Sequence, residues 1–230
     1  MATFGYGGTP LFIDGCKHVS HCFPLNGNIK SPEISGGIPS VLQTYKERVT
    51  MISFDGPTVF SEVIGKAIEM MKSMNSEQIS LYSSQSISDV RKEKYLVLLI
   101  LTDGSMSDFR DSVDAIYFSS FLPISIVIVG IGKSHTKQLK LLNSPFKSSL
   151  EDLPFRHNVS YLQFSDYLDD NEFLNAALSP IPTQFLEYFH KNSILPTALN
   201  FKDSMMLKKS SVSSQYFLFF IFFNSPNRIP

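Results

Sequence analysis

Three short, mainly apolar runs along the chain predict buried β-strands. Residues 95–101 form the clearest, seven apolar residues that end abruptly at Thr102-Asp103-Gly104. Residues 124–129 and 159–164 form the other two. Short, nearly continuous apolar runs are typical of strands covered on both faces, as in a parallel sheet with helices above and below it.

Amphipathic helices alternate with these strands. Residues 59–74 form the best one, because one apolar stripe repeats there at spacings of three and four; it comprises Phe60, Val63, Ile64, Ala67, Ile68, Met71 and Met74. Thr58 precedes this helix as a natural N-cap, and Asp108 takes the same place before a helix predicted over 109–120. Shorter helices are predicted at 41–49, 135–142, 172–178 and 182–189. The alternation predicts an open parallel sheet with crossover helices.

The remaining segments predict loops, one extended stretch and a tail. Residues 18–25 suit a short extended segment, and residues 31–39, with two prolines and two glycines, predict a loop. Serine-rich residues 75–94 predict a mobile surface loop. The aromatic run 216–223 predicts a strand or an exposed tail, since its eight residues fall short of the roughly 20 that a spanning helix needs. We therefore expect one domain over 1–200 and a divergent, disordered or strand-forming tail over 201–230.

Charge and cysteine content narrow the classes of function. The formal net charge is −1 and no dense basic patch occurs, which argues against a nucleic-acid partner. Two cysteines, Cys16 and Cys22, provide no disulfide framework and indicate a reducing, intracellular setting. The first ten residues lack the basic and apolar regions of a signal peptide.

Two segments are candidates for ligand binding. Asp103 follows a predicted strand at the edge where open α/β sheets bind ligands, although Asp-Gly is also ordinary turn chemistry. The segment Gly132-Lys133-Ser134 resembles the end of a phosphate-binding loop and predicts, as an alternative, a small nucleotide-binding protein. The full phosphate-loop pattern needs a glycine where Val127 stands, so a tight strand-to-helix turn is the simpler interpretation.

A third cluster carries soft metal ligands: Cys16, His18, His21 and Cys22. Zinc sites normally use two separated ligand pairs, whereas these four side chains fall within seven residues of one extended segment. Alternation would send His21 to the face opposite the other three. A surface strand with incidental cysteines is therefore the simpler interpretation, and with no nucleophile elbow in the sequence we expect no enzyme.

Several segments together resemble the carboxyl-terminal domain of copines, which has a von Willebrand factor A-like fold. The resemblance covers about residues 4–196 and rests on these stretches, in order: Phe4-Gly-Tyr-Gly, Val19 to Asn28, Gly56-Pro-Thr-Val-Phe60, Leu98 to Gly104 with Ser107-Asp108, Leu122 to Gly132, and Ile181-Pro-Thr-Gln184. Relative to this family, residues 75–94 look like an insertion.

The resemblance implies a fold and a role. It implies an intracellular, cytoplasmic protein, with the periphery of the plasma membrane as the alternative location. Copines bind phospholipid in a calcium-dependent way through two C2 domains, and their A-like domain recruits partner proteins. The related metal site uses an Asp-x-Ser-x-Ser motif, a threonine and an aspartate; Thr58 matches the threonine and Asp103 the aspartate. Such hard oxygen ligands suit Mg²⁺, Mn²⁺ or Ca²⁺.

The sequence also departs from this family. No Asp-x-Ser-x-Ser motif precedes Thr58, where the first strand of the family's fold would carry it. From the resemblance we expect that the chain lacks the C2 domains and this first strand, which is central to the family's sheet. We therefore expect an A-like α/β domain without its first strand, an incomplete metal site at Thr58 and Asp103, and at most weak divalent-cation binding. The predicted function is a protein-interaction module of a copine; a copine-like ubiquitin ligase has no Cys/His-rich RING pattern to support it.

Overall fold

The computed structural model describes residues 1–54, 56–82, 94–103, 106–132, 137–143, 156–194 and 217–222. Of these, residues 76–82 and 217–222 are described by their backbone alone. The predicted serine-rich loop beyond residue 82, as well as Lys133 and Ser134, lies outside this description. So do residues 201–216 and 223–230 of the predicted tail.

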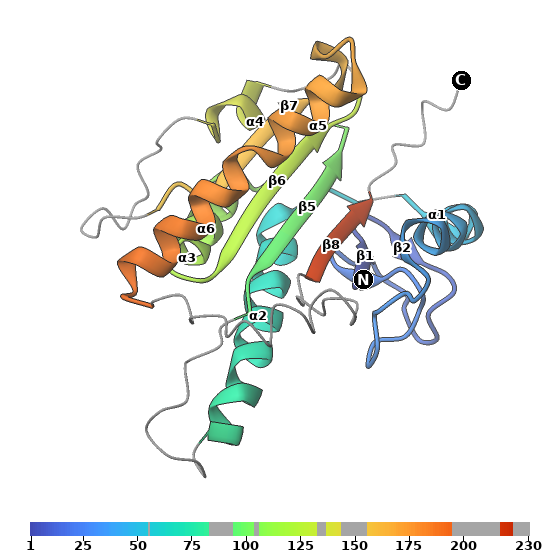
Figure 1. The fold of residues 1–230 in the computed structure, drawn as a ribbon. Helices are drawn as coiled ribbons and strands as arrows, with labels where there is room; N and C mark the ends of the chain where they lie inside the picture. The colour runs from blue at the N-terminus through green and yellow to red at the C-terminus, as the bar shows by residue number, and fades with distance from the viewer. Residues whose placement is uncertain are drawn as a thin grey trace.

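A six-stranded sheet forms the centre of the fold, with the strand order β3-β1-β8-β5-β6-β7 (Figure 1). The strands are β1 (Thr3–Gly5), β3 (Phe23–Pro24), β5 (Leu96–Thr102), β6 (Ile124–Gly130), β7 (Val159–Gln163) and β8 (Phe217–Phe222). All neighbours are parallel except β1 and β3. The three predicted strands are confirmed as β5, β6 and β7, which are adjacent and parallel.

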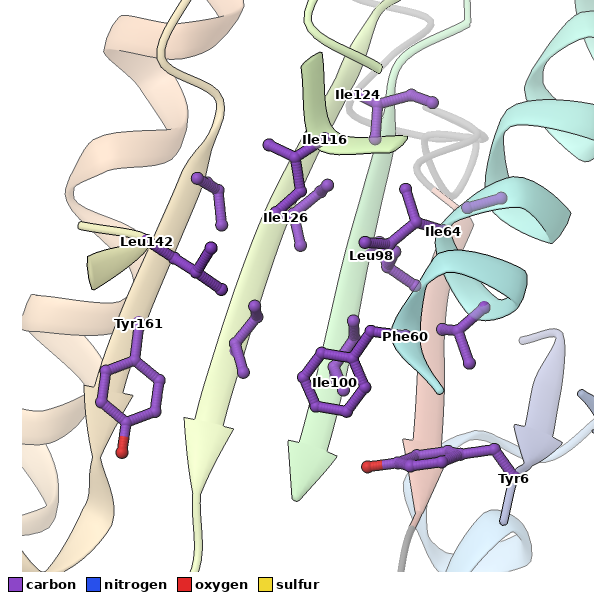
Figure 2. Close-up of a cluster of buried hydrophobic side chains, with 14 of the residues drawn as sticks. Tyr6, Phe60, Ile64, Leu98, Ile100, Ile116, Ile124, Ile126, Leu142 and Tyr161 are labelled. Atoms are coloured by element: carbon purple, nitrogen blue, oxygen red, sulfur yellow. The ribbon is translucent and has the colours of Figure 1, made fainter. Parts of the chain in front are cut away.

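Helices cover both faces of this sheet. On one face lie α2 (Phe60–Tyr82), α3 (Phe109–Ser119) and α4 (Lys137–Leu141), and on the other lie α5 (Asp170–Leu178) and α6 (Pro180–Lys191). Figure 2 shows the first layer, where Phe60 and Ile64 of α2 lie beside Leu98 and Ile100 of β5. The second layer packs Tyr188 of α6 and other apolar side chains against the opposite face. The predicted α/β class, with helices above and below parallel strands, is confirmed.

The amino-terminal region forms a smaller layer beside β1. It contains α1 (Gly37–Arg48), η1 (Val49–Met51) and a two-stranded sheet of β2 (Thr9–Pro10) and β4 (Ile52–Ser53). The predicted extended segment 18–25 is a strand only at β3. The sequence missed β1, β2 and β4, because strands of two or three residues carry no readable alternation.

Two predicted helix boundaries were wrong. The second helix does not end at Met74 but continues through Tyr82, so the predicted loop begins at least eight residues too early. Neither glycine nor proline occurs between Gly65 and Gly104, and serine costs a helix little, so nothing in the sequence stops it. The predicted loop 31–39 is also too long, because α1 already begins at Gly37.

The start of α1 explains its glycines and its proline. Gly36 and Gly37 have φ angles of 92° and 74°, a backbone region that glycine enters without steric cost. Pro39 falls in the first turn, where a backbone amide has no partner within the helix to lose. The glycines and the proline that predicted a loop therefore form the start of α1.

The aromatic run near the carboxyl end is a strand in the structure. β8 lies between β1 and β5 and pairs with both, so the tail is not wholly disordered. From the sequence we expect a sheet that lacks the first, central strand of the A-like fold. In the structure, β8 lies in the middle of the sheet. Within the described part of the chain, no helix is both long and apolar enough to cross a bilayer.

Cys22 should be far less reactive than Cys16 toward a thiol reagent at pH 8. Burial raises the pKa of the Cys22 thiol to about 12, against the opposing effect of Lys66. The thiolate is the reactive form, so the Cys22 thiol stays protonated and slow at this pH. Labelling of Cys16→Ser and Cys22→Ser variants, followed by absorbance, measures each thiol alone. Equal rates in the two variants would contradict the buried position of Cys22.

Candidate metal centre

The carboxyl end of β5 and the start of α2 meet at one edge of the sheet. Ser107 donates its amide N–H to the carbonyl oxygen of Thr58 at 2.9 Å, which joins the loop after Asp103 to the residues before α2. Ile131 donates its amide to the carbonyl of Thr102 at 2.6 Å. The structure therefore places Thr58 and Asp103, the two predicted metal ligands, in connected segments at the edge where parallel strands end.

Asp108 has a different role from the one predicted. Its carboxylate does not cap α3; it accepts the amide of Phe60 at 3.0 Å and that of Ser61 at 2.8 Å, and so caps α2. A carboxylate at a helix start satisfies amides that lack partners and complements the positive end of the helix dipole. The predicted cap of α3 is therefore wrong, because a contact 48 residues away along the chain takes its side chain.

Replacing Asp108 by alanine should lower the free energy of unfolding by about 1–2 kcal/mol, because two amides at the start of α2 lose their acceptor. Urea unfolding followed by circular dichroism measures the change. Asp14→Ala removes an exposed carboxylate that caps no helix and should change stability by less than about 0.5 kcal/mol. Equal losses in the two variants would mean that the Asp108 contacts contribute nothing.

Tyr6 is a buried polar residue at this edge that the sequence did not reveal. Its hydroxyl donates to the carbonyl of Leu101 at 2.8 Å, and its ring meets that of Phe60 edge-on, with centroids 5.9 Å apart. Burial raises the pKa of this hydroxyl, the hydrogen bond with Thr102 lowers it, and the negative charge of Asp103 raises it further. Tyr6 therefore stays neutral and connects β1, β5 and α2.

The donors described at this edge fit a divalent cation poorly. Thr58 is buried, Asp103 is half-buried, and both carboxylate oxygens of Asp108 already accept backbone amides. Across the described residues, no cluster of three or more His, Cys, Asp or Glu side chains could hold a metal ion. A magnesium or calcium shell needs six or more oxygen ligands, so the described side chains would leave most positions to water.

The turn after β6 bears on the predicted nucleotide site. Gly132 has a φ angle of 90° and its carbonyl accepts the Gln163 side-chain amide. A Cβ at Gly130 would clash with the side chains of Gln163 and Tyr161, which explains that glycine by packing. The helix that follows, α4, has only five residues. The described part of this turn therefore requires glycine at Gly130 for packing and favours it at Gly132 for backbone conformation.

The four soft ligands near the amino terminus are not gathered into a site. Cys16 Sγ contacts the carbonyl of His18 at 3.6 Å, whereas Cys22 packs against the main core. No ligand cluster of the kind that zinc needs occurs in the part of the chain that is described. The zinc interpretation gains no support.

Arg156 is a second buried polar residue that the sequence did not reveal, and it lies at the opposite end of the strands. It is 2% exposed and donates to carbonyl groups at the ends of several elements. The acceptors are the carbonyls of Ser120 (3.4 Å), Leu122 (2.9 Å), Ile124 (2.8 Å) and Gln184 (3.1 Å) and the hydroxyl of Tyr95 (3.3 Å). These contacts give Arg156 a structural role, because they join the start of β6 to α6.

Comparison with known proteins identifies the family to which this chain belongs. The family model for copines matches residues 1–197. This chain belongs to the copine family. Among curated copine relatives, it is 34% identical to Protein BONZAI 2 of Arabidopsis thaliana over 199 residues and 34% identical to Copine-A of Dictyostelium discoideum over 200 residues. Copine-C of Dictyostelium discoideum is 32% identical over 197 residues.

These matches cover most of this chain but only a small part of each relative. They cover 84%, 85% and 84% of this chain but only 31%, 30% and 33% of the three relatives, respectively. The chain thus spans about a third of the length of the copines it matches. The matched region contains every described element except β8, which begins 20 residues after the match ends.

Proposed function

We propose that this chain is a protein-interaction module of a copine, with a von Willebrand factor A-like fold and no catalytic activity. The match to the copine family over residues 1–197 is the observation that carries the proposal. The parallel strands β5, β6 and β7 with helices on both faces support the A-like fold. Calcium-dependent phospholipid binding, which the family resemblance implies for whole copines, we assign to other parts of those proteins.

The partner should bind along the edge where the parallel strands end. Ile131 follows β6 and is 48% exposed, while Phe164 and Leu168, which follow β7, are 48% and fully exposed. Asp103 follows β5 at the same edge. Open α/β sheets bind their ligands beyond the carboxyl ends of the strands, and grouped apolar side chains indicate a macromolecular partner. We infer a protein partner that presents an apolar side chain next to a basic one.

Site-specific photocrosslinking tests this surface. A photoreactive phenylalanine analogue at Leu168 should give an adduct of defined mass with one partner, and the same analogue at Leu186 should not. Leu186 is a matched control because it is 59% exposed but lies on α6. Adding Ile131→Glu to the Leu168 chain should abolish the adduct. Identical adducts from both positions, or an adduct indifferent to Ile131→Glu, would refute the proposed surface.

A divalent cation should bind weakly, and a nucleotide should not bind. Titration of Mg²⁺ against the full chain should raise its melting temperature little, because Thr58 and Asp103 supply few ligands. ATP without metal should leave the melting temperature unchanged. A saturable rise with Mg²⁺ that Asp103→Ala removes would reveal a working metal site. A rise with ATP that Lys133→Ala removes would instead favour the nucleotide-binding alternative.

A further inference from the structure

One strand joins the two halves of the sheet. β8 pairs with β1 through Thr3↔Phe220 and with β5 through Leu99↔Phe220, parallel to both. Figure 1 shows it between β5 and β1. β1 has only the two-residue β3 as its other neighbour, and β5 continues into β6 and β7. Without β8, both β1 and β5 would present an unpaired edge to solvent.

The slot that β8 fills is bordered by apolar side chains of the two neighbouring strands. Along β5, Leu98 and Ile100 face the core under α2, whereas Val97 faces the opposite layer with Tyr95. Phe4 of β1, the strand on the other side of the slot, belongs to the same core under α2 as Leu98 and Ile100. Figure 2 shows the β8 ribbon running beside Leu98 and Ile100. A strand placed here therefore meets the core under α2 on one face and lies beside the apolar side chains of β5 on the other.

The sequence of β8 matches such a slot. Its six residues, Phe-Leu-Phe-Phe-Ile-Phe, contain no polar side chain and no proline. A strand covered on both faces reads as a continuous apolar run, and a proline would remove an amide from the ladder. An edge strand or an exposed tail needs no such composition.

The filling strand comes from outside the copine match. The family match ends at residue 197, and β8 begins at Phe217. Twenty-two residues separate Ile194 from Phe217. Extended at about 3.3 Å per residue, this segment exceeds the width of the sheet, where neighbouring strands lie about 4.8 Å apart. Occupation of the slot by the chain's own tail is therefore sterically easy.

We propose that the copine-matching region contains a strand-binding slot between β1 and β5, and that residues 217–222 are its ligand. The ligand is defined by its chemistry: a parallel β-strand of about six apolar residues, without proline. The slot recognises it through the two backbone ladders of β1 and β5 and through the apolar layer under α2. The tail thus acts as a complementing strand that holds the β1–β3 pair to the β5–β6–β7 sheet.

Hydrogen exchange on the full chain tests the slot. In the unmodified protein, amides of β5 should be protected as strongly as those of β6. Phe220→Pro removes an amide in the middle of β8 and should abolish protection of those β1 and β5 amides that face β8, while β6 and β7 stay protected. Phe220→Leu keeps both the amide and the apolar side chain and should match the unmodified protein. Unchanged protection of β1 and β5 in Phe220→Pro would overturn the proposal.

A peptide supplies the ligand from outside. A fluorescent peptide of residues 214–225, with lysines added for solubility, should bind the Phe220→Pro chain and restore the protection of β5. The same peptide carrying the proline should not bind. Failure of the first peptide to bind, or equal binding of both, would overturn the slot.

A cleavable chain covers the case in which Phe220→Pro does not fold. A protease site inserted between Ser210 and Ser211 allows the tail to be cut after the full chain has folded. If β8 occupies the slot, the two pieces should co-elute after cleavage and separate only in denaturant. Separation of the pieces under native conditions would overturn the proposal.

Discussion

Replacing Arg156 by methionine should lower the free energy of unfolding by about 3–5 kcal/mol, because several hydrogen bonds from a charged group are lost. The guanidinium donates to four backbone carbonyls and to the Tyr95 hydroxyl in a site that is 2% exposed. Methionine fills a similar volume but donates no hydrogen bond, so all five hydrogen bonds are lost, although the carbonyls of Leu122 and Ile124 keep the amide of Ile124 and the side chain of Asn158 as donors. Each hydrogen bond from a charged group contributes about 1.5–3 kcal/mol to stability, and the retained donors offset part of that loss.

The charge of Arg156 makes the comparison with lysine informative. Burial lowers the pKa of its guanidinium, and the Tyr95 hydroxyl opposes that effect. Lysine keeps the charge but has three donors on one nitrogen, whereas arginine has five donors in a planar fork. Arg156→Lys should therefore lose less stability than Arg156→Met, but should not match the unmodified protein.

Urea denaturation followed by circular dichroism measures these losses. Arg110→Met is the matched control, because Arg110 is exposed near the start of α3, and its loss should stay within about 0.5 kcal/mol. A loss at Arg156 no larger than that at Arg110 would mean that the buried hydrogen bonds do not hold β6 to α6.

Local patterns predicted the central strands and helices well. Continuous apolar runs identified β5, β6 and β7, because a strand covered on both faces leaves no polar side to confuse the pattern. Spacings of three and four identified α2 for the same reason: one stripe faces a core. The end of α2 was missed, because serine-rich composition suggested a loop where no residue interrupts the helix.

Long-range contacts account for what local patterns could not predict. Asp108 precedes α3, but its carboxylate caps α2, a choice made by tertiary packing. Arg156 stands in a sequence without periodicity, so nothing marks it as buried. Likewise, the aromatic run 217–222 indicated a strand or a tail, but its place between β1 and β5 depends on pairing with residues more than a hundred positions away.

The place of Asp103 after a predicted strand made it a candidate ligand, but only the family resemblance paired it with Thr58 as a metal site. Thr58 and Asp103 do lie in segments that a hydrogen bond from Ser107 joins, so the resemblance selected neighbouring parts of the fold. The resemblance did not reveal Tyr6, whose buried hydroxyl binds the end of β5 from β1. A tyrosine in a glycine-rich amino terminus has no local signature of such a contact.

The two faces of β5 should respond differently to loss of side-chain volume. Leu98 is fully buried in the core under α2 and α3, so Leu98→Ala should cost about 2–5 kcal/mol of unfolding free energy through lost burial and a residual cavity. Leu99 is half-buried and lines an apolar groove of about 470 Å³ between β5, β6 and α5. Leu99→Ala should therefore cost only about 1 kcal/mol.

The difference between these neighbours distinguishes a closed layer from an open one. The sequence predicts that residues 95–101 are covered on both faces alike, whereas the structure closes the α2 face and leaves a groove on the other. Paired urea denaturation of Leu98→Ala and Leu99→Ala measures that asymmetry, since both variants lose the same atoms from adjacent positions of one strand. Equal losses would mean that the groove is closed in solution and that β5 is buried symmetrically, as its uninterrupted apolar sequence alone predicts.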